Sequence, residues 1–132
     1  LFELLDYLTV RDNILLPFLV NNALQRDGAA DERCRSLAAR LGLETKLSRF
    51  PADLSQGERQ RTAICRALVV QPALVMADEP TGNLNESTAL DLQALLRDMH
   101  REHGLTSIIV THNPRLAAAC DRTLRLEAGQ LV

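Results

Sequence analysis

The first third of the chain carries apolar residues at helical spacing. Thr9 and Asp12 resemble a capping box and begin a first helix, whose regularity Pro17 limits. Asp31 is expected to cap a second helix, which Gly42 closes. The apolar positions behind these predictions are Val10, Ile14, Leu15 and Phe18 in the first helix, and Cys34, Leu37, Ala38 and Leu41 in the second.

The pattern changes after a shorter helical segment expected at residues 44–49. Ser55 and Glu58 then form an S-x-x-E capping box, which marks the beginning of another helix. This helix is predicted to run to about Val70, because Pro72 follows its end.

Two short apolar runs, residues 74–77 and 107–110, predict strands that are buried on both faces. The helix between them ends at Gly104 and rests on the apolar positions Leu92, Leu95, Leu96 and Met99. Pro114 begins a further helix, and the turn at 128–129 indicates a terminal hairpin. Strand, helix and strand in this order predict an α/β fold, a parallel sheet with flanking helices.

Composition narrows the class of protein. The 132 residues are 46% hydrophobic with a net charge of −2, which suits one globular domain and provides no broad basic surface for nucleic acid. No apolar run approaches the roughly 20 residues that cross a bilayer. Cys34, Cys65 and Cys120 lack the paired spacing of a zinc site, so they are expected to be buried thiols in a reducing compartment, by default the cytoplasm.

Polar residues stand at the carboxyl ends of both predicted strands. Asp78 and Glu79 follow the first strand, and Thr111 and His112 follow the second. Taken alone, Asp78 can cap a turn and His112 can be an ordinary polar residue at a strand exit. Parallel strands, however, bring their carboxyl ends to one edge of the sheet, where ligands bind. Two carboxylates there suit a hydrated Mg²⁺ and a water nucleophile, one holding the cation and the other orienting or deprotonating the water.

The helix start at Ser55, Gln56, Gly57 and Glu58 is a second candidate site. A capping box explains Ser55 and Glu58 but leaves Gly57 at a position where glycine weakens a helix. A helix N-terminus without a side chain in the way can bind phosphate through its free N–H groups. Both candidate sites therefore point to phosphate chemistry.

Four motifs follow one another along the chain. Residues 54–58 read L-S-Q-G-E, residues 74–79 end in Asp-Glu, residues 81–85 read T-G-N-L-N, and His112 follows the second strand. In this order they resemble the L-S-G-G-Q signature, the Walker B strand with its following glutamate, the D-loop and the switch histidine of the ATP-binding cassette (ABC) ATPases. The resemblance covers nearly the whole chain and implies part of an ABC-type P-loop NTPase domain with an α-helical subdomain.

The resemblance implies a role for each matched residue. Asp78 would bind Mg²⁺ through water, Glu79 would be the general base for ATP hydrolysis, and His112 would contact the γ-phosphate. The helix start at 55–58 would close over an ATP held by a second nucleotide-binding subunit. Asn85 would lie in the D-loop between the two nucleotide sites.

The resemblance also implies two regions and a membrane partner. Residues 1–53 correspond to the helical subdomain that follows the Q-loop and receives a transmembrane permease subunit. Residues 54–132 correspond to the signature helix and the C-terminal part of the RecA-like core. The protein would then be cytoplasmic, peripheral on the inner face of the membrane through its partner. The form T-G-N-L at 81–84 resembles the branch of lipoprotein-releasing, macrolide-export and cell-division cassettes.

The sequence departs from the family pattern at several points. Gln56 replaces the first signature glycine, Glu58 replaces glutamine, and Asn85 replaces an aspartate whose charge is thought to link the two sites. A phosphate loop of the form G-x-x-x-x-G-K-[ST] is missing, because the only lysine, Lys46, lies in G-L-E-T-K-L-S without the second glycine.

The missing phosphate loop leaves three interpretations open. The first is the C-terminal part of a transporter ATPase, inactive alone, whose sheet would expose apolar surface. The second is a soluble ABC ATPase that acts on ribosomes or DNA, against which stand the T-G-N-L motif and the lack of coiled-coil arms or a basic patch. The third is a truncated, non-enzymatic binding module.

Overall fold

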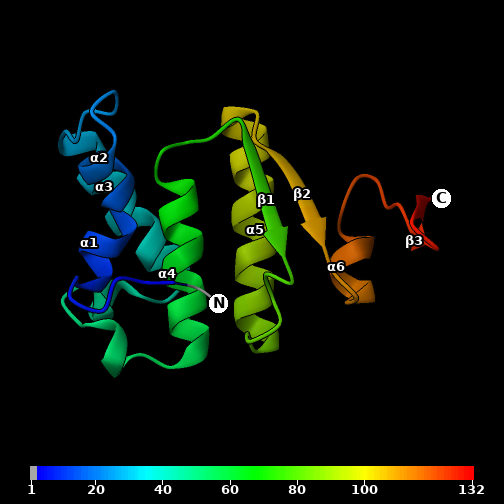
Figure 1. The fold of residues 1–132 in the computed structure, drawn as a ribbon, viewed down its shortest axis with the longest axis horizontal. Coiled ribbons are helices and arrows are strands. Elements are labelled where there is room, and N and C mark those ends of the chain that lie inside the picture. The colour runs from blue at the N-terminus through cyan, green and yellow to red at the C-terminus, as the bar shows by residue number, and fades with distance from the viewer. Residues whose placement is uncertain (1–2) are drawn as a thin grey trace.

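The computed structural model describes residues 3–132, so the first two residues of the expected 1–53 region lie outside it. Its first part, on the left of Figure 1, is entirely helical. The elements of this part are α1 (Val10–Ile14), α2 (Leu16–Val20), α3 (Gly28–Arg40) and two 3₁₀ turns, Glu44–Lys46 and Pro51–Asp53.

The second part is a parallel strand pair with helices, followed by a small hairpin (Figure 1). Strands β1 and β2 pair in parallel from Leu74 with Thr106 to Asp78 with Val110. This confirms the predicted α/β fold with a parallel sheet. The elements of this part are α4 (Gln56–Leu68), β1 (Leu74–Asp78), α5 (Glu86–His103), β2 (Thr106–Val110), α6 (Pro114–Ala118), β3 (Leu126–Glu127) and β4 (Gln130–Leu131).

Local signals in the sequence locate several helix ends correctly. Thr9 caps α1, and Ser55 and Glu58 form the reciprocal capping box of α4. Gly104 ends α5 in the left-handed conformation, with a φ of 68°, which glycine adopts without steric cost. Helix α4 ends at Leu68, two residues before the predicted end.

The predicted cap of α3 is wrong. Asp27 is the N-cap and accepts a hydrogen bond from the Ala30 N–H, so the helix begins one turn earlier than expected. Asp31 lies in the first turn, where its carboxylate binds the Arg26 and Arg11 guanidinium groups. These hydrogen bonds lower the pKa of Asp31 from 3.8 to about 2, and Arg26 has the larger effect.

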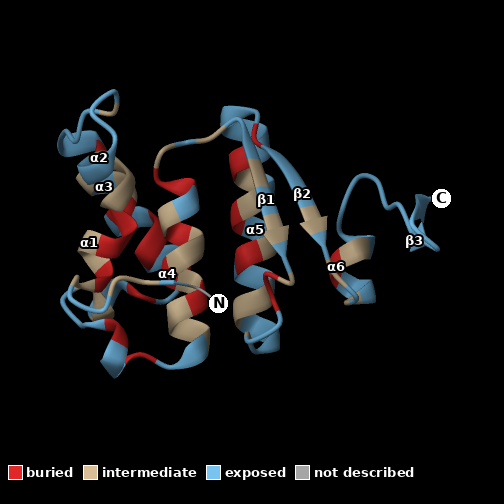
Figure 2. Ribbon diagram, in the orientation of Figure 1, coloured by how far each residue is buried: buried red, intermediate tan, exposed pale blue. Residues whose placement is uncertain are grey.

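The hydrophobic core lies between the helices (Figure 2). Its largest fully buried side chains are Ile14, Leu15, Leu41, Leu43, Leu68, Leu92, Leu95 and Leu105. The prediction that the strands are buried on both faces is wrong, because Met76 is 76% and Val110 62% exposed. Strand side chains alternate between faces. Val75 packs against the core, whereas no element within residues 3–132 buries the face that carries Met76.

Two further expectations concern the cysteines and the membrane. Cys34 and Cys65 are buried as predicted, but Cys120 is exposed, which corrects the expectation of three buried thiols. Among residues 3–132, no helix combines the length and apolar character that a bilayer span requires.

Candidate functional site

Glu79 lies where β1 ends, against the residues that follow β2. Its backbone N–H donates to the Val110 carbonyl at 2.8 Å, which continues the strand pairing by one residue. The Thr111 hydroxyl donates to Glu79 Oε2 at 3.0 Å, and the His112 N–H donates to Oε1 at 2.7 Å. His112 Nδ1 lies 2.6 Å from the same Oε1. The sheet edge therefore brings together Glu79, Thr111 and His112.

These contacts shift the pKa of Glu79. Burial raises the pKa of its carboxyl, but hydrogen bonds from the His112 N–H, the Thr111 hydroxyl and the His112 imidazole together lower it below the usual 4.5. The carboxylate, which is ionised at neutral pH as in an ordinary glutamate, therefore stays ionised to a lower pH than usual. The His112 side chain is 91% exposed, so its ring is accessible to a ligand.

Asp78 is the last residue of β1 and is exposed. Within residues 3–132 its carboxylate has no hydrogen-bond or ion-pair partner, which leaves both oxygens free for a hydrated cation. No group of three or more His, Cys, Asp and Glu side chains in the described part of the chain is arranged to hold a metal. Mg²⁺ is commonly held by one or two carboxylates together with water and phosphate oxygens, and Asp78 is a residue that could serve as such a carboxylate.

At the start of α4 the capping box uses the side chains of Ser55 and Glu58. The Ser55 N–H donates to Glu58 Oε2 at 2.8 Å, and the Glu58 N–H donates to Ser55 Oγ at 3.2 Å. The first of these bonds is the main reason why the pKa of Glu58 is lowered. A carboxylate in the first turn also interacts favourably with the helix dipole. Glu58, which stands where the family pattern has glutamine, thus stabilises the helix start through its carboxylate.

Gly57 has a reason to be glycine within its own chain. A Cβ at this position would lie 2.8 Å from the Asn83 carbonyl oxygen, closer than real Cβ atoms approach. The start of α4 therefore packs directly on the T-G-N-L-N segment. Access for phosphate, the explanation considered from the sequence, is not needed to account for this glycine.

Asn85 is the N-cap of α5. Its Oδ1 accepts hydrogen bonds from the Thr88 N–H at 2.9 Å and from the Thr88 hydroxyl at 2.8 Å. Asparagine caps a helix as well as aspartate does. The departure from aspartate therefore preserves the cap while removing a charge.

Gln60 was not identified from the sequence. Its side chain is 3% exposed, and its Nε2 donates to the carbonyls of Glu79 at 3.1 Å and Pro80 at 2.8 Å. Its Oε1 accepts a hydrogen bond from the Asn83 N–H at 3.3 Å. The available signal was its spacing, because Gln60 stands four residues before Ile64, on the inward stripe of α4.

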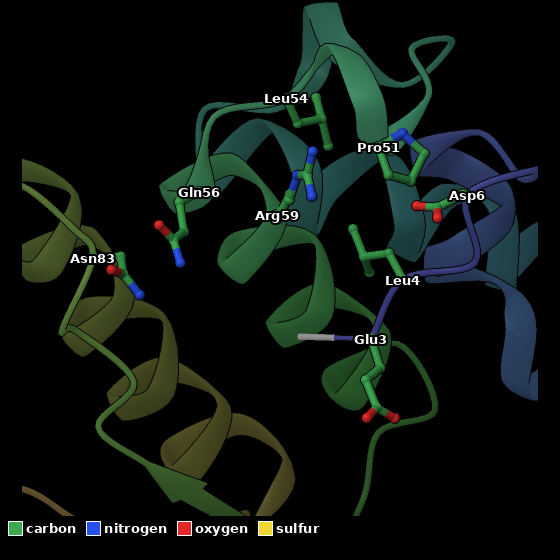
Figure 3. Close-up of a pocket in the computed structure, with 8 residues that line it drawn as sticks. All are labelled: Glu3, Leu4, Asp6, Pro51, Leu54, Gln56, Arg59 and Asn83. Carbon is green, nitrogen blue, oxygen red and sulfur yellow. The ribbon is translucent and has the colours of Figure 1, made fainter. Parts of the chain in front are cut away.

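Gln60 and Gly57, rather than the side chains of the capping box, connect the start of α4 to residues 79–83. Within residues 3–132, no hydrogen bond or ion pair joins residues 55–58 to Asp78, Glu79 or His112. An open hollow of about 690 Å³ lies beside the helix start, with Gln56 and Asn83 on adjoining walls (Figure 3). Its lining residues are Glu3, Leu4, Asp6, Pro51, Leu54, Gln56, Arg59 and Asn83.

Comparison with known proteins gives consistent matches. A family model described as "ABC transporter" matches residues 2–82. The lipoprotein-releasing system ATP-binding protein LolD of Ruegeria sp. (strain TM1040) is 48% identical over 130 residues, which are 98% of this chain and 56% of that protein. The LolD protein of Geobacter metallireducens is 43% identical, again over 98% of this chain and 57% of its own length.

Solved structures also match the fold of this chain. The dimeric structure of MJ0796, described as a bacterial ABC transporter cassette, has a TM-score of 0.88 and 32% identity, and the match covers 98% of this chain and 57% of that one. A dimeric post-hydrolysis state of the same cassette, bound to ADP and Pi, matches with a TM-score of 0.88 and 31% identity. The chain thus spans slightly more than half the length of the proteins it matches.

Proposed function

Because the chain belongs to the ABC transporter family, we propose that it is the part of an ATP-hydrolysing transporter subunit that carries the general base. The observation that carries this proposal is Glu79, an ionised carboxylate at the sheet edge beside the exposed ring of His112. A carboxylate has about four acceptor positions. Three are occupied here, two on Oε1 and one on Oε2, which leaves Oε2 with room for a water.

Each side chain at the sheet edge then has a separate role in ATP hydrolysis. Glu79 orients the attacking water and accepts its proton, and the exposed His112 ring contacts the γ-phosphate of ATP. Asp78 holds Mg²⁺ through water. The bound ion supplies charge neutralisation for the phosphates.

The nucleotide site requires parts that these 132 residues do not contain. A ring of backbone N–H groups and a lysine normally hold the β- and γ-phosphates, and no G-x-x-x-x-G-K-[ST] loop occurs in this sequence. The term "complete cassette" denotes a polypeptide that carries both such a loop and these 132 residues. Residues 55–58 would close over an ATP bound by a second copy, a proposal that the dimeric state of the matched MJ0796 structures supports.

The names of the relatives support a proposal for the transported cargo and the membrane partner. The LolD proteins are described as parts of a lipoprotein-releasing system. We therefore place the complete cassette on the cytoplasmic face of a membrane, where residues 1–53 form the helical subdomain that meets a permease subunit. Lipoprotein release is the proposed work of that assembly.

ATP turnover by two polypeptides tests this function. The 132-residue chain alone should show no turnover above background, and the complete cassette with Mg²⁺ should hydrolyse ATP. Strong hydrolysis by the short chain would contradict the need for a phosphate loop. A gene product without such a loop, or a complete cassette that binds ATP without ever hydrolysing it, would favour the binding-module interpretation instead.

A further inference from the structure

Gln60 connects the start of α4 to the segment that carries Glu79. Both donor hydrogens of its buried amide are used, one on the Glu79 carbonyl and one on the Pro80 carbonyl. Its oxygen accepts the Asn83 N–H. A buried amide with these bonds satisfied holds its partners in place, because each lost bond would leave a polar group unpaired.

The backbone that Gln60 holds is strained. Glu79 has a φ of 45°, in the left-handed region that residues other than glycine rarely adopt. Such a conformation is energetically costly for a residue with a side chain and persists only where the surroundings fix it. The Val110 carbonyl and the Gly82 N–H bind the backbone of Glu79 at 2.8 and 3.0 Å, and Gln60 adds a side-chain donor from a different helix. This conformation directs the Glu79 carboxylate at Thr111 and His112.

The same helix has a second contact with this segment. Gly57, three residues before Gln60, leaves no space for a Cβ above the Asn83 carbonyl. Residues 57 and 60 therefore attach α4 to both ends of the segment 79–83. These contacts form a continuous packed and hydrogen-bonded connection between the start of α4 and Glu79.

We propose that Gln60 is a positioning residue that couples the helix start at 55–58 to the general base Glu79 of the same copy. This inference rests on the function proposed above. When residues 55–58 close over the nucleotide of a second copy, Gln60 would set the Glu79 backbone for hydrolysis of the nucleotide in its own copy. Gln60 itself touches no reacting atom.

Gln60→Met in the complete cassette tests the coupling. Methionine fills a similar volume but cannot donate to the two carbonyls. We expect the ATP dissociation constant to stay within about twofold of wild type, because the phosphate loop is untouched. The kcat should fall about 10- to 100-fold, as for a small misplacement of a catalytic group. The matched control is Thr62→Val, since Thr62 is equally buried in α4 but its hydroxyl bonds only the Glu58 carbonyl of the same helix. It should leave kcat unchanged.

A double-mutant cycle separates positioning from general damage. If Gln60 acts through Glu79, then Gln60→Met should change the residual rate of the Glu79→Gln variant by no more than about twofold. An unchanged kcat in the single variant, or an equal fall in both backgrounds, would overturn the inference. Should Gln60→Met fail to fold, Gln60→Glu serves instead, because a carboxyl keeps the shape and the acceptor for Asn83 and, when protonated, can donate only one of the two hydrogen bonds. Failure of the proposed function would look different, with no turnover in wild type or full turnover in Glu79→Gln.

Discussion

Gly57→Ala in the complete cassette tests how α4 packs on the T-G-N-L-N segment. The new Cβ would lie 2.8 Å from the Asn83 carbonyl oxygen, whereas ordinary contacts begin at 3.4 Å, so backbone must move by several tenths of an ångström. Overpacking of this kind costs about 1–3 kcal/mol. Alanine returns up to about 1 kcal/mol through its helix propensity. The net expectation is a modest loss of stability.

Gly28→Ala is the matched control. Gly28 also lies in the first turn of a helix, but a Cβ there would meet nothing within 4 Å. The difference in unfolding free energy between the two variants therefore isolates the contact, at about 1–3 kcal/mol.

Thermal unfolding with a near-neutral buffer measures this difference. For a cassette of the length of the matched relatives, each kcal/mol shifts Tm by about 2–4 °C. Gly57→Ala should melt several degrees below Gly28→Ala and should also lower ATP turnover, because Asn83 is displaced. Equal melting temperatures for the two variants would refute the packing argument and leave phosphate access as the only reason for Gly57.

Two further predictions concern pH and thiol reactivity. Because the pKa of Asp31 is low, its ion pairs stabilise the fold at pH values above 3.8 and are lost as the pH falls from 3.8 to about 2. Asp31→Asn should therefore lower the unfolding free energy at neutral pH, and this deficit should shrink between pH 3.8 and about 2. A deficit in unfolding free energy that is constant across the window would contradict this. Under native conditions iodoacetamide should label Cys120 and spare Cys34 and Cys65, because burial raises the pKa of both, to about 11 for Cys34. Labelling of all three at similar rates in mass spectra would show that the helical core is open.

Features of the fold that depend on local sequence were predictable. The Ser55 and Glu58 box and the Gly104 cap are decided within one helical turn, and the structure has both. The cap of α3 was not predictable in this way, because Asp27 and Asp31 both suit a cap. Long-range pairing with Arg11 engages Asp31 and leaves Asp27 as the cap. The exposure of Met76 was not predicted either, because an apolar run does not show whether other elements cover one face of a strand or both.

The candidate site likewise has contacts that the sequence predicts and contacts that it does not. The meeting of Glu79 and His112 follows from the rule that parallel strands end at one edge, so the sequence was sufficient for it. Spacing within α4 indicates that Gln60 faces inward, but its partners and those of Gly57 depend on how α4 lies against residues 79–83, which is a tertiary relation. The roles of these residues in catalysis remain predictions.

The most direct test of the account is ATP turnover by Glu79→Gln in the complete cassette. The amide keeps the shape of the side chain but cannot accept the proton of the attacking water, so kcat should fall about 10²- to 10⁴-fold. Affinity for ATP should be retained, and the stalled enzyme should dimerise with ATP in light scattering. Glu127→Gln, the same change in the exposed terminal hairpin, should hydrolyse ATP like wild type. If Glu79→Gln hydrolyses ATP at the wild-type rate, Glu79 is not the general base and the proposed catalytic role of this chain is wrong.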